Sequence, residues 1–192
     1  MRALLYRRCV CVRRRSRFQP RTDKEVRRGD LSSDLRADLA AKLAGRTCVM
    51  GIGDRQWGDD GLGVALAESL KRKNCPDVLV AGNVPENWIG RIGQDEFDQV
   101  LLIDAVEYAG EPGSVVILDE GQLRSRFPQV STHKLSLGML AALIQHESGA
   151  RVWCLGVKPA SLKSGTGLSE PVQATLQVLE EVLLKILKSK EL

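Results

Sequence analysis

Two adjacent carboxylates stand inside a glycine-rich segment, GIGDRQWGDDGLG, at residues 51–63. An apolar run, TCVM, precedes this segment and an amphipathic run, VALAESLKRK, follows it, which predicts a loop between a strand and a helix. A phosphate-binding P-loop needs Lys and Ser or Thr where this chain has Asp59 and Asp60. The dinucleotide-binding pattern fails too, because Gln56 stands where its third glycine is required. The acidic pair would repel an anion, so the sequence predicts a cation site.

Apolar runs alternate with amphipathic segments along the chain, and together they predict the elements that position this loop. This alternation is typical of an α/β protein: a three-layer, doubly wound sandwich with a mostly parallel five-stranded sheet and helices on both faces. Only nine residues separate Asp104 from Ser114, too few for a helical crossover, so we expect the third and fourth strands to be antiparallel neighbours. The expected strands are 47–52, 77–81, 99–105, 114–119 and 151–157; the expected helices are 32–44, 59–73, 133–145 and 170–188, with a short helical stretch at 86–93 and an irregular stretch at 120–132.

The carboxyl ends of parallel strands meet at one edge of a sheet, where ligands bind in this fold class. This rule selects Asp60 in the loop after the first strand and Asp104 at the end of the third. It also selects Gly82 and Asn83 after the second strand, and the segment 131–133, Ser-Thr-His, before a later helix. These segments could converge on one crevice.

Asp60, Asp104 and His133 would supply two carboxylate oxygens and one imidazole nitrogen to a shared metal ion. A divalent cation removes the repulsion between two neighbouring carboxylates, and this donor set suits nickel, zinc, iron or manganese. Each residue also has a structural interpretation: a helix N-terminal acid, a turn cap and a surface histidine, respectively. Asp59 is expected to point toward the N-terminus of the following helix and to matter less.

The charge of the chain is unevenly distributed. Residues 1–30 hold 11 Lys or Arg against 3 Asp or Glu, whereas the other 162 residues hold 17 against 21. We expect residues 1–30 to be a basic, disordered extension and residues 31–192 to be a single domain. A transit peptide or an RNA-binding tail are the alternative interpretations of the arm. The mildly acidic domain itself predicts no nucleic-acid partner.

The apolar runs are too short to span a bilayer, and arginines interrupt those near the N-terminus. The five cysteines are scattered and odd in number, which favours reduced thiols in the cytosol. We therefore expect a cytoplasmic monomer with no membrane partner, in which Cys48 and Cys154 are core residues.

Several motifs together resemble those of one family. VMGIGDRQWGDDGLG is similar to the opening motif of the nickel–iron hydrogenase maturation endopeptidases, and AGNVPENWIG, LLIDAVEYAGEPG, STHKLSL and LGVKPAS with GLSEPV follow in the family's order. The PEN and VKP segments resemble the branch that serves hydrogenase 3. The similarity extends over about residues 32–190.

The resemblance implies that Asp60, Asp104 and His133 contact nickel already inserted in the precursor of a hydrogenase large subunit, a site that zinc or cadmium could also occupy. The family's enzymes remove a C-terminal extension from that precursor, and Gly82 and Asn83 are expected to contact it. No Ser-His-Asp or Cys-His unit is evident, so the expected route is water attack with Asp60 or Asp104 as general base.

One departure from the family's pattern and one alternative function remain. Asp54 stands where the family usually has Asn, and an ionised Asp cannot donate a hydrogen bond as Asn does. A non-catalytic, nickel-dependent binding module or chaperone for the precursor would keep the same three ligands. The acidic loop disfavours a nucleotide-binding domain.

Deleting residues 1–30 should leave folding and precursor cleavage unchanged. The arm has no periodic apolar face, and its charge is opposite to that of the remaining chain. The melting temperature and the cleavage rate of the truncated and full-length proteins provide the test. A truncated protein that is insoluble or inactive would show that the arm belongs to the fold or to substrate docking.

Overall fold

The computed structural model describes residues 33–126 and 135–190, so the basic arm, the segment 131–133 and its His133 lie outside the described residues. Within the described ranges, none of the helices combines the length and the apolar composition that crossing a membrane would need.

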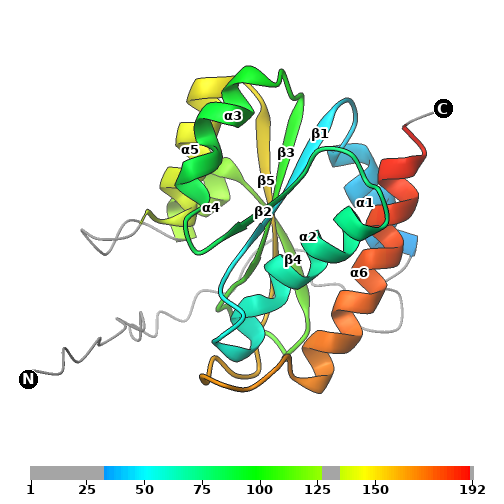
Figure 1. Cartoon of the computed structure of the whole chain (residues 1–192), viewed down its shortest axis with the longest axis vertical. Helices are drawn as coiled ribbons and strands as arrows, with labels where there is room; N and C mark the ends of the chain where they lie inside the picture. The colour runs from blue at the N-terminus through cyan, green and yellow to red at the C-terminus, as the bar shows by residue number, and fades with distance from the viewer. Residues whose placement is uncertain (1–32, 127–134, 191–192) are drawn as a thin grey trace, which may run out of the picture.

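One sheet with the strand order β2-β1-β3-β5-β4 forms the centre of the molecule (Figure 1). β1 pairs in parallel with β2 and β3, β3 pairs in parallel with β5, and β4 pairs antiparallel with β5. This confirms a mostly parallel five-stranded sheet with one antiparallel strand. The strands are β1 (Thr47–Ile52), β2 (Val78–Gly82), β3 (Gln99–Ala105), β4 (Val115–Asp119) and β5 (Arg151–Val157).

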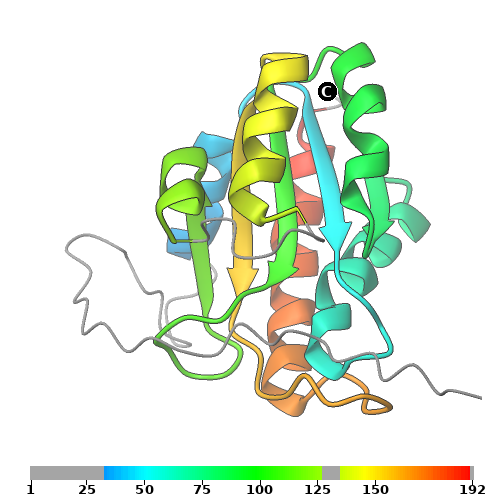
Figure 2. The ribbon, with the colours of Figure 1, turned by 90° about the vertical axis from the view of Figure 1, so that its left-hand side faces the viewer.

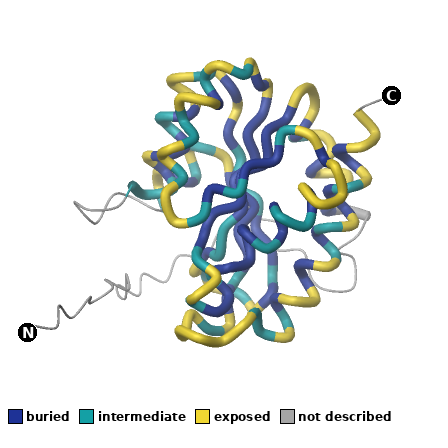
Figure 3. Tube along the Cα trace, in the orientation of Figure 1, coloured by how far each residue is buried: buried dark blue, intermediate teal, exposed yellow. Residues whose placement is uncertain are grey.

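Helices cover both faces of the sheet, which confirms the three-layer sandwich. One apolar core lies between the sheet and α1, α2 and α6, and a second lies between the sheet and α3, α4 and α5 (Figures 1 and 3). Successive side chains of a strand point to opposite faces, so Leu101 and Ile103 enter the first core and Val100 and Leu102 the second. The helices are α1 (Ser33–Lys42), α2 (Leu62–Arg72), α3 (Ile89–Gln94), α4 (Glu120–Arg126), α5 (Leu137–Ser148) and α6 (Glu170–Lys188), with 3-10 turns η1 (Gly58–Gly61) and η2 (Pro85–Trp88).

The prediction that the third and fourth strands are neighbours is wrong, although β4 is indeed the antiparallel strand. β5 lies between β3 and β4. The link from β3 to β4 therefore crosses the carboxyl end of β5. The link is bonded to that end: Val106 N donates to Val157 O (2.9 Å), and Lys158 N donates to Ser114 O (2.9 Å). Two strand spacings amount to about 10 Å, a distance that nine residues easily bridge.

α4 was not expected, because residues 120–132 were predicted to be irregular. Its start carries a reciprocal cap: Gln122 N donates to Asp119 Oδ1 (2.8 Å), and Asp119 N donates to Gln122 Oε1 (2.9 Å). The Asp-x-x-Gln spacing was therefore a signal in the sequence. α5 begins at Leu137, later than predicted, because Ser136 is its N-cap and accepts a hydrogen bond from Met139 N (3.2 Å).

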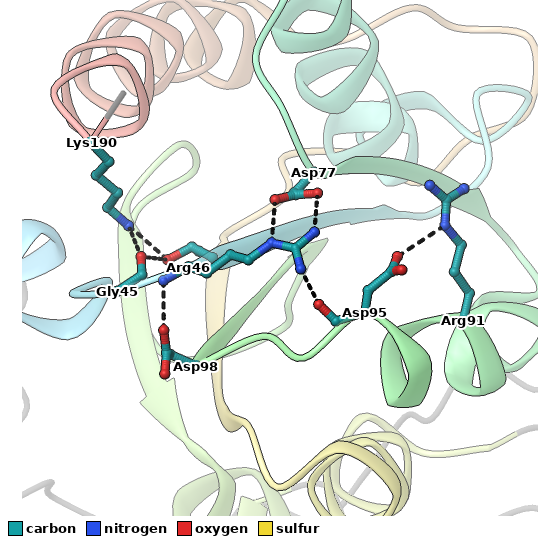
Figure 4. A network of polar contacts seen from close by, with 8 residues as sticks. Gly45, Arg46, Asp77, Arg91, Asp95, Asp98 and Lys190 are labelled. Carbon is teal, nitrogen blue, oxygen red and sulfur yellow. Dashed lines mark hydrogen bonds and ion pairs between the residues drawn. The ribbon is translucent and has the colours of Figure 1, made fainter. Parts of the chain in front are cut away.

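The amino edge of the sheet is closed by a polar network centred on Arg46 (Figure 4). The Arg46 guanidinium donates two hydrogen bonds to the Asp77 carboxylate (3.1 and 3.2 Å), and Arg46 N donates to Asp98 Oδ2 (2.7 Å). Lys190 adds a bond to Gly45 O (3.0 Å), which attaches the end of the chain to the segment after α1. Since Arg46 is exposed, its ion pair contributes little stability. The network connects elements rather than forming a site.

At the carboxyl end of the sheet, Gly51 and Gly63 have no side chains, and this allows α2 to approach β1 and β3 closely. A Cβ at Gly63 would lie 2.2 Å from Ile103 O and 2.3 Å from Ile52 O, and a Cβ at Gly51 would lie 2.1 Å from Gly63 O. No side chain fits at either position without moving the helix from the sheet.

Gly63→Ala should lower the free energy of unfolding by about 1–3 kcal/mol, because the added methyl group overpacks the contact between α2 and the sheet. Gly90→Ala is the matched control, since Gly90 lies in α3 and its Cβ position has no atom within 4 Å apart from its chain neighbours and the backbone of its own helix. The control should be neutral or stabilising by up to about 1 kcal/mol, because alanine is the better helix former. Urea denaturation of both variants measures the difference; equal stabilities would contradict the steric explanation.

Candidate active site

The turn after β1 folds back over the carboxyl edge of the sheet. Gly53 has φ of 121°, a conformation that favours glycine, and its N–H donates to Gly82 O (2.9 Å) at the end of β2. A Cβ at Gly53 would lie 1.8 Å from Asp60 O and 3.8 Å from Asp104 Oδ1. The backbone at Gly53 therefore lies between the turn that carries Asp60 and the carboxylate of Asp104. The arrowheads of β1, β3 and β5 point to this same end (Figure 2).

Asp60 and Asp104 are brought together as predicted. Asp60 Oδ2 accepts a hydrogen bond from Asp54 N (2.9 Å), and Asp104 Oδ1 accepts one from Ala105 N (2.8 Å). Burial first, and then the negative charge of Asp60, raise the pKa of Asp104 to about 7, while the bond from Ala105 N–H acts in the opposite direction. Such a pair can hold a proton or share a cation.

The third predicted ligand, His133, lies outside the described residues, so its position relative to the two carboxylates stays a prediction. Across residues 33–126 and 135–190, no group of three or more His, Cys, Asp or Glu side chains is arranged to hold a metal ion.

Gly82 and Asn83 lie at the same edge, beside the first turn. Gly82 has φ of 65°, and its carbonyl accepts the bond from Gly53 N. Gly82 therefore holds the backbone of the turn at Gly53 through this hydrogen bond. Asn83 is exposed. Their contact with a substrate stays a prediction.

Asp54 organises the turn as a hydrogen-bond acceptor. Its Oδ1 accepts a bond from Gln56 N (2.9 Å), an arrangement in which Asp and Asn serve equally. The departure from the family's Asn therefore leaves this part of the loop intact.

The expected direction of the Asp59 side chain is wrong. Its carboxylate does not face the start of α2; it is 1% exposed and accepts bonds from Ala160 N, Ser161 N and Ser169. These partners belong to the loop between β5 and α6, more than 100 residues along the chain. Sequence spacing cannot reveal a contact of that separation.

Comparison with known proteins identifies the family. The model for the hydrogenase maturation protease family HycI matches residues 64–186. This chain belongs to the hydrogenase maturation proteases. It is 26% identical over 134 residues to the hydrogenase 3 maturation protease of Escherichia coli K12, covering 69% of this chain and 85% of that protein. It is 31% identical over 152 residues to the hydrogenase expression/formation protein HoxM of Azotobacter vinelandii, covering 74% and 72%.

Solved structures agree with this assignment. The crystal structure of the nickel–iron hydrogenase maturation protease HycI from Thermococcus kodakarensis KOD1 aligns with a TM-score of 0.71 and 32% identity, covering 79% of this chain and 99% of that one. The family resemblance of the sequence motifs is therefore confirmed, together with the α/β fold of the protease.

The raised pKa of Asp104 predicts how the stability of the metal-free protease depends on pH. An aspartate in an unfolded chain titrates near about 3.9, so between about pH 4 and 7 the folded state binds more protons than the unfolded state. The free energy of unfolding should therefore fall as pH rises through this window. Asp104→Asn should lose this decline and be more stable than the wild type above about pH 7.

Urea denaturation in the presence of a chelator measures both proteins, because a bound cation would stabilise the ionised carboxylates. The exposed acid Glu181 provides a control, Glu181→Gln, which should retain the wild-type dependence. The same decline in the Asp104 variant would show that another group causes it.

Proposed function

We propose that this protease removes the C-terminal extension from the nickel-loaded precursor of a nickel–iron hydrogenase large subunit. The observation that carries the proposal is the pairing of Asp60 with Asp104 at the carboxyl edge of the sheet, in a chain whose relatives include a hydrogenase 3 maturation protease. A hydrogenase of this type is the expected partner.

The two carboxylates suit recognition of a divalent cation that belongs to the substrate. Burial, and then the negative charge of Asp60, raise the pKa of Asp104, and a cation between the two carboxylates would offset both costs. We assign His133 as the third donor, because imidazole with carboxylates suits nickel as well as zinc or cadmium. Three protein donors would leave coordination positions for groups of the precursor.

Peptide-bond cleavage in this site would use water rather than a side-chain nucleophile. The cysteines within the described part of the chain, Cys48, Cys75 and Cys154, are buried, and burial raises the pKa of Cys48 to about 12. A thiolate attack is therefore disfavoured. Asp60 or Asp104 would act as the general base for the attacking water, and the metal would polarise the scissile carbonyl or lower the pKa of that water.

The proposal also includes a monomeric protein that acts in the cytoplasm. The free thiols of Cys48, Cys75 and Cys154 support a reducing compartment. A non-catalytic binding module for the precursor is the alternative, and none of the observed contacts favours it over the protease.

Cleavage of purified precursor, followed by the change in mobility on a gel, tests the function. The wild type should shorten nickel-loaded precursor and leave nickel-free precursor intact. Asp60→Asn, Asp104→Asn and His133→Ala should each reduce the rate by at least about 100-fold, since each removes a donor or the base. Glu181→Gln should cleave like the wild type, because this exposed carboxylate lies in α6, outside the proposed site.

Circular dichroism should show that the variants remain folded. Near-wild-type cleavage by one variant would remove that residue from the proposed trio. Binding of nickel-loaded precursor without any cleavage would favour the binding module instead.

A further inference from the structure

The Asp59 carboxylate, next to Asp60 in the chain, accepts four hydrogen bonds. Its Oδ2 accepts hydrogen bonds from Ala160 N (2.8 Å), Ser161 N (2.9 Å) and Ser169 Oγ (2.9 Å), and its Oδ1 accepts one from Ser169 N (2.6 Å). All four contacts come from N–H or O–H donors, and the two carboxylate oxygens are the acceptors. With an exposure of 1%, Asp59 cannot reach a substrate.

The loop that surrounds Asp59 is attached to the same turn by backbone bonds as well. Asp59 N donates to Ser161 O (3.0 Å), and Gly165 N donates to Gln56 O (2.9 Å). The contact is close, because a Cβ at Gly58 would lie 2.8 Å from Ser161 O. The loop at 160–169 therefore holds the turn 56–59 at both of its ends.

The geometry of η1 separates the two acids. Successive residues of a 3-10 helix are about 120° apart, so adjacent side chains point in different directions. Asp59 points into the loop before α6, whereas Asp60 lies beside Asp104 and accepts a bond from Asp54 N. A rotation of this turn would move both carboxylates together, because they share one backbone segment of four residues.

We propose that Asp59 is a positioning residue: its buried hydrogen bonds to the loop 160–169 fix the rotation of η1 and thereby place the carboxylate of Asp60. The inference rests on the proposed function only in taking Asp60 as a residue of the reactive site. The bonds join segments about 100 residues apart, and at this turn they replace a side-chain cap, because η1 has none.

The Asp54 amide reports the position of Asp60 directly, since its N–H donates to Asp60 Oδ2 (2.9 Å). In Asp59→Asn, an amide NH₂ group replaces one acceptor oxygen and faces donors that it cannot satisfy. Hydrogen exchange at the Asp54 amide, followed by NMR without precursor, should then become about tenfold faster, as expected when an ordinary hydrogen bond no longer protects it.

Thr47→Val is the matched control for a general loss of stability. Thr47 is a buried polar residue in β1 at the opposite edge of the sheet, and its hydroxyl donates to Leu43 O (3.0 Å). The substitution should leave exchange at Asp54 unchanged. Ser169→Ala removes only one of the four bonds to Asp59 and should increase the exchange rate by less, which keeps the test available if Asp59→Asn does not fold.

Cleavage kinetics provide the second measurement. A positioning role predicts that Asp59→Asn lowers kcat at least about tenfold, whereas Thr47→Val keeps kcat at a temperature where both are folded. Exchange at Asp54 that is equally fast in Asp59→Asn and Thr47→Val would overturn the proposal. If the wild type cleaves no precursor, the proposed function fails, but the exchange measurement still decides the role of Asp59.

Discussion

The close approach of α2 to the sheet is the constraint on which the site depends. It requires that Gly51 and Gly63 carry no side chain, because a Cβ at either position would lie within 2.3 Å of a backbone oxygen. Gly53 extends the same requirement into the turn, where its Cβ would overlap Asp60 O. This close packing places η1 over the carboxyl end of β1, near the Asp104 carboxylate at the end of β3. The glycines of this segment therefore serve close packing rather than phosphate binding.

The position of η1 determines the different surroundings of the two adjacent acids, Asp59 and Asp60. Asp59 is turned into the protein, where the loop before α6 surrounds it with donors, and Asp60 is left beside Asp104. A buried carboxylate that accepts four hydrogen bonds holds the neighbouring backbone in place. The negative charge of Asp60 adds to the effect of burial in raising the pKa of Asp104, so one residue of the acidic pair holds a loop and the other acts electrostatically on Asp104.

The charged side chains are arranged differently at the two edges of the sheet. At the amino edge, Arg46 is bonded to Asp77 and its backbone to Asp98, so opposite charges are paired (Figure 4). At the carboxyl edge, two carboxylates lie together, and burial, followed by the negative charge of Asp60, raises the pKa of Asp104 to about 7. Protein stability favours the first arrangement, whereas the second becomes favourable when a cation or a proton is shared, as a reactive site requires.

The sequence by itself determined the helices and strands other than α4, and it selected the candidate site residues. Leucines at 35, 39 and 43 predict the buried face of α1, and the apolar runs predict all five strands, because these signals are local and periodic. The rule for parallel sheets brought Asp60 and Asp104 to one edge. Only the tertiary structure decided that β5 lies between β3 and β4, that Asp59 faces a loop 101 residues or more away, and that burial raises the pKa of Asp104. These features arise from contacts and desolvation between distant segments, which no local pattern encodes.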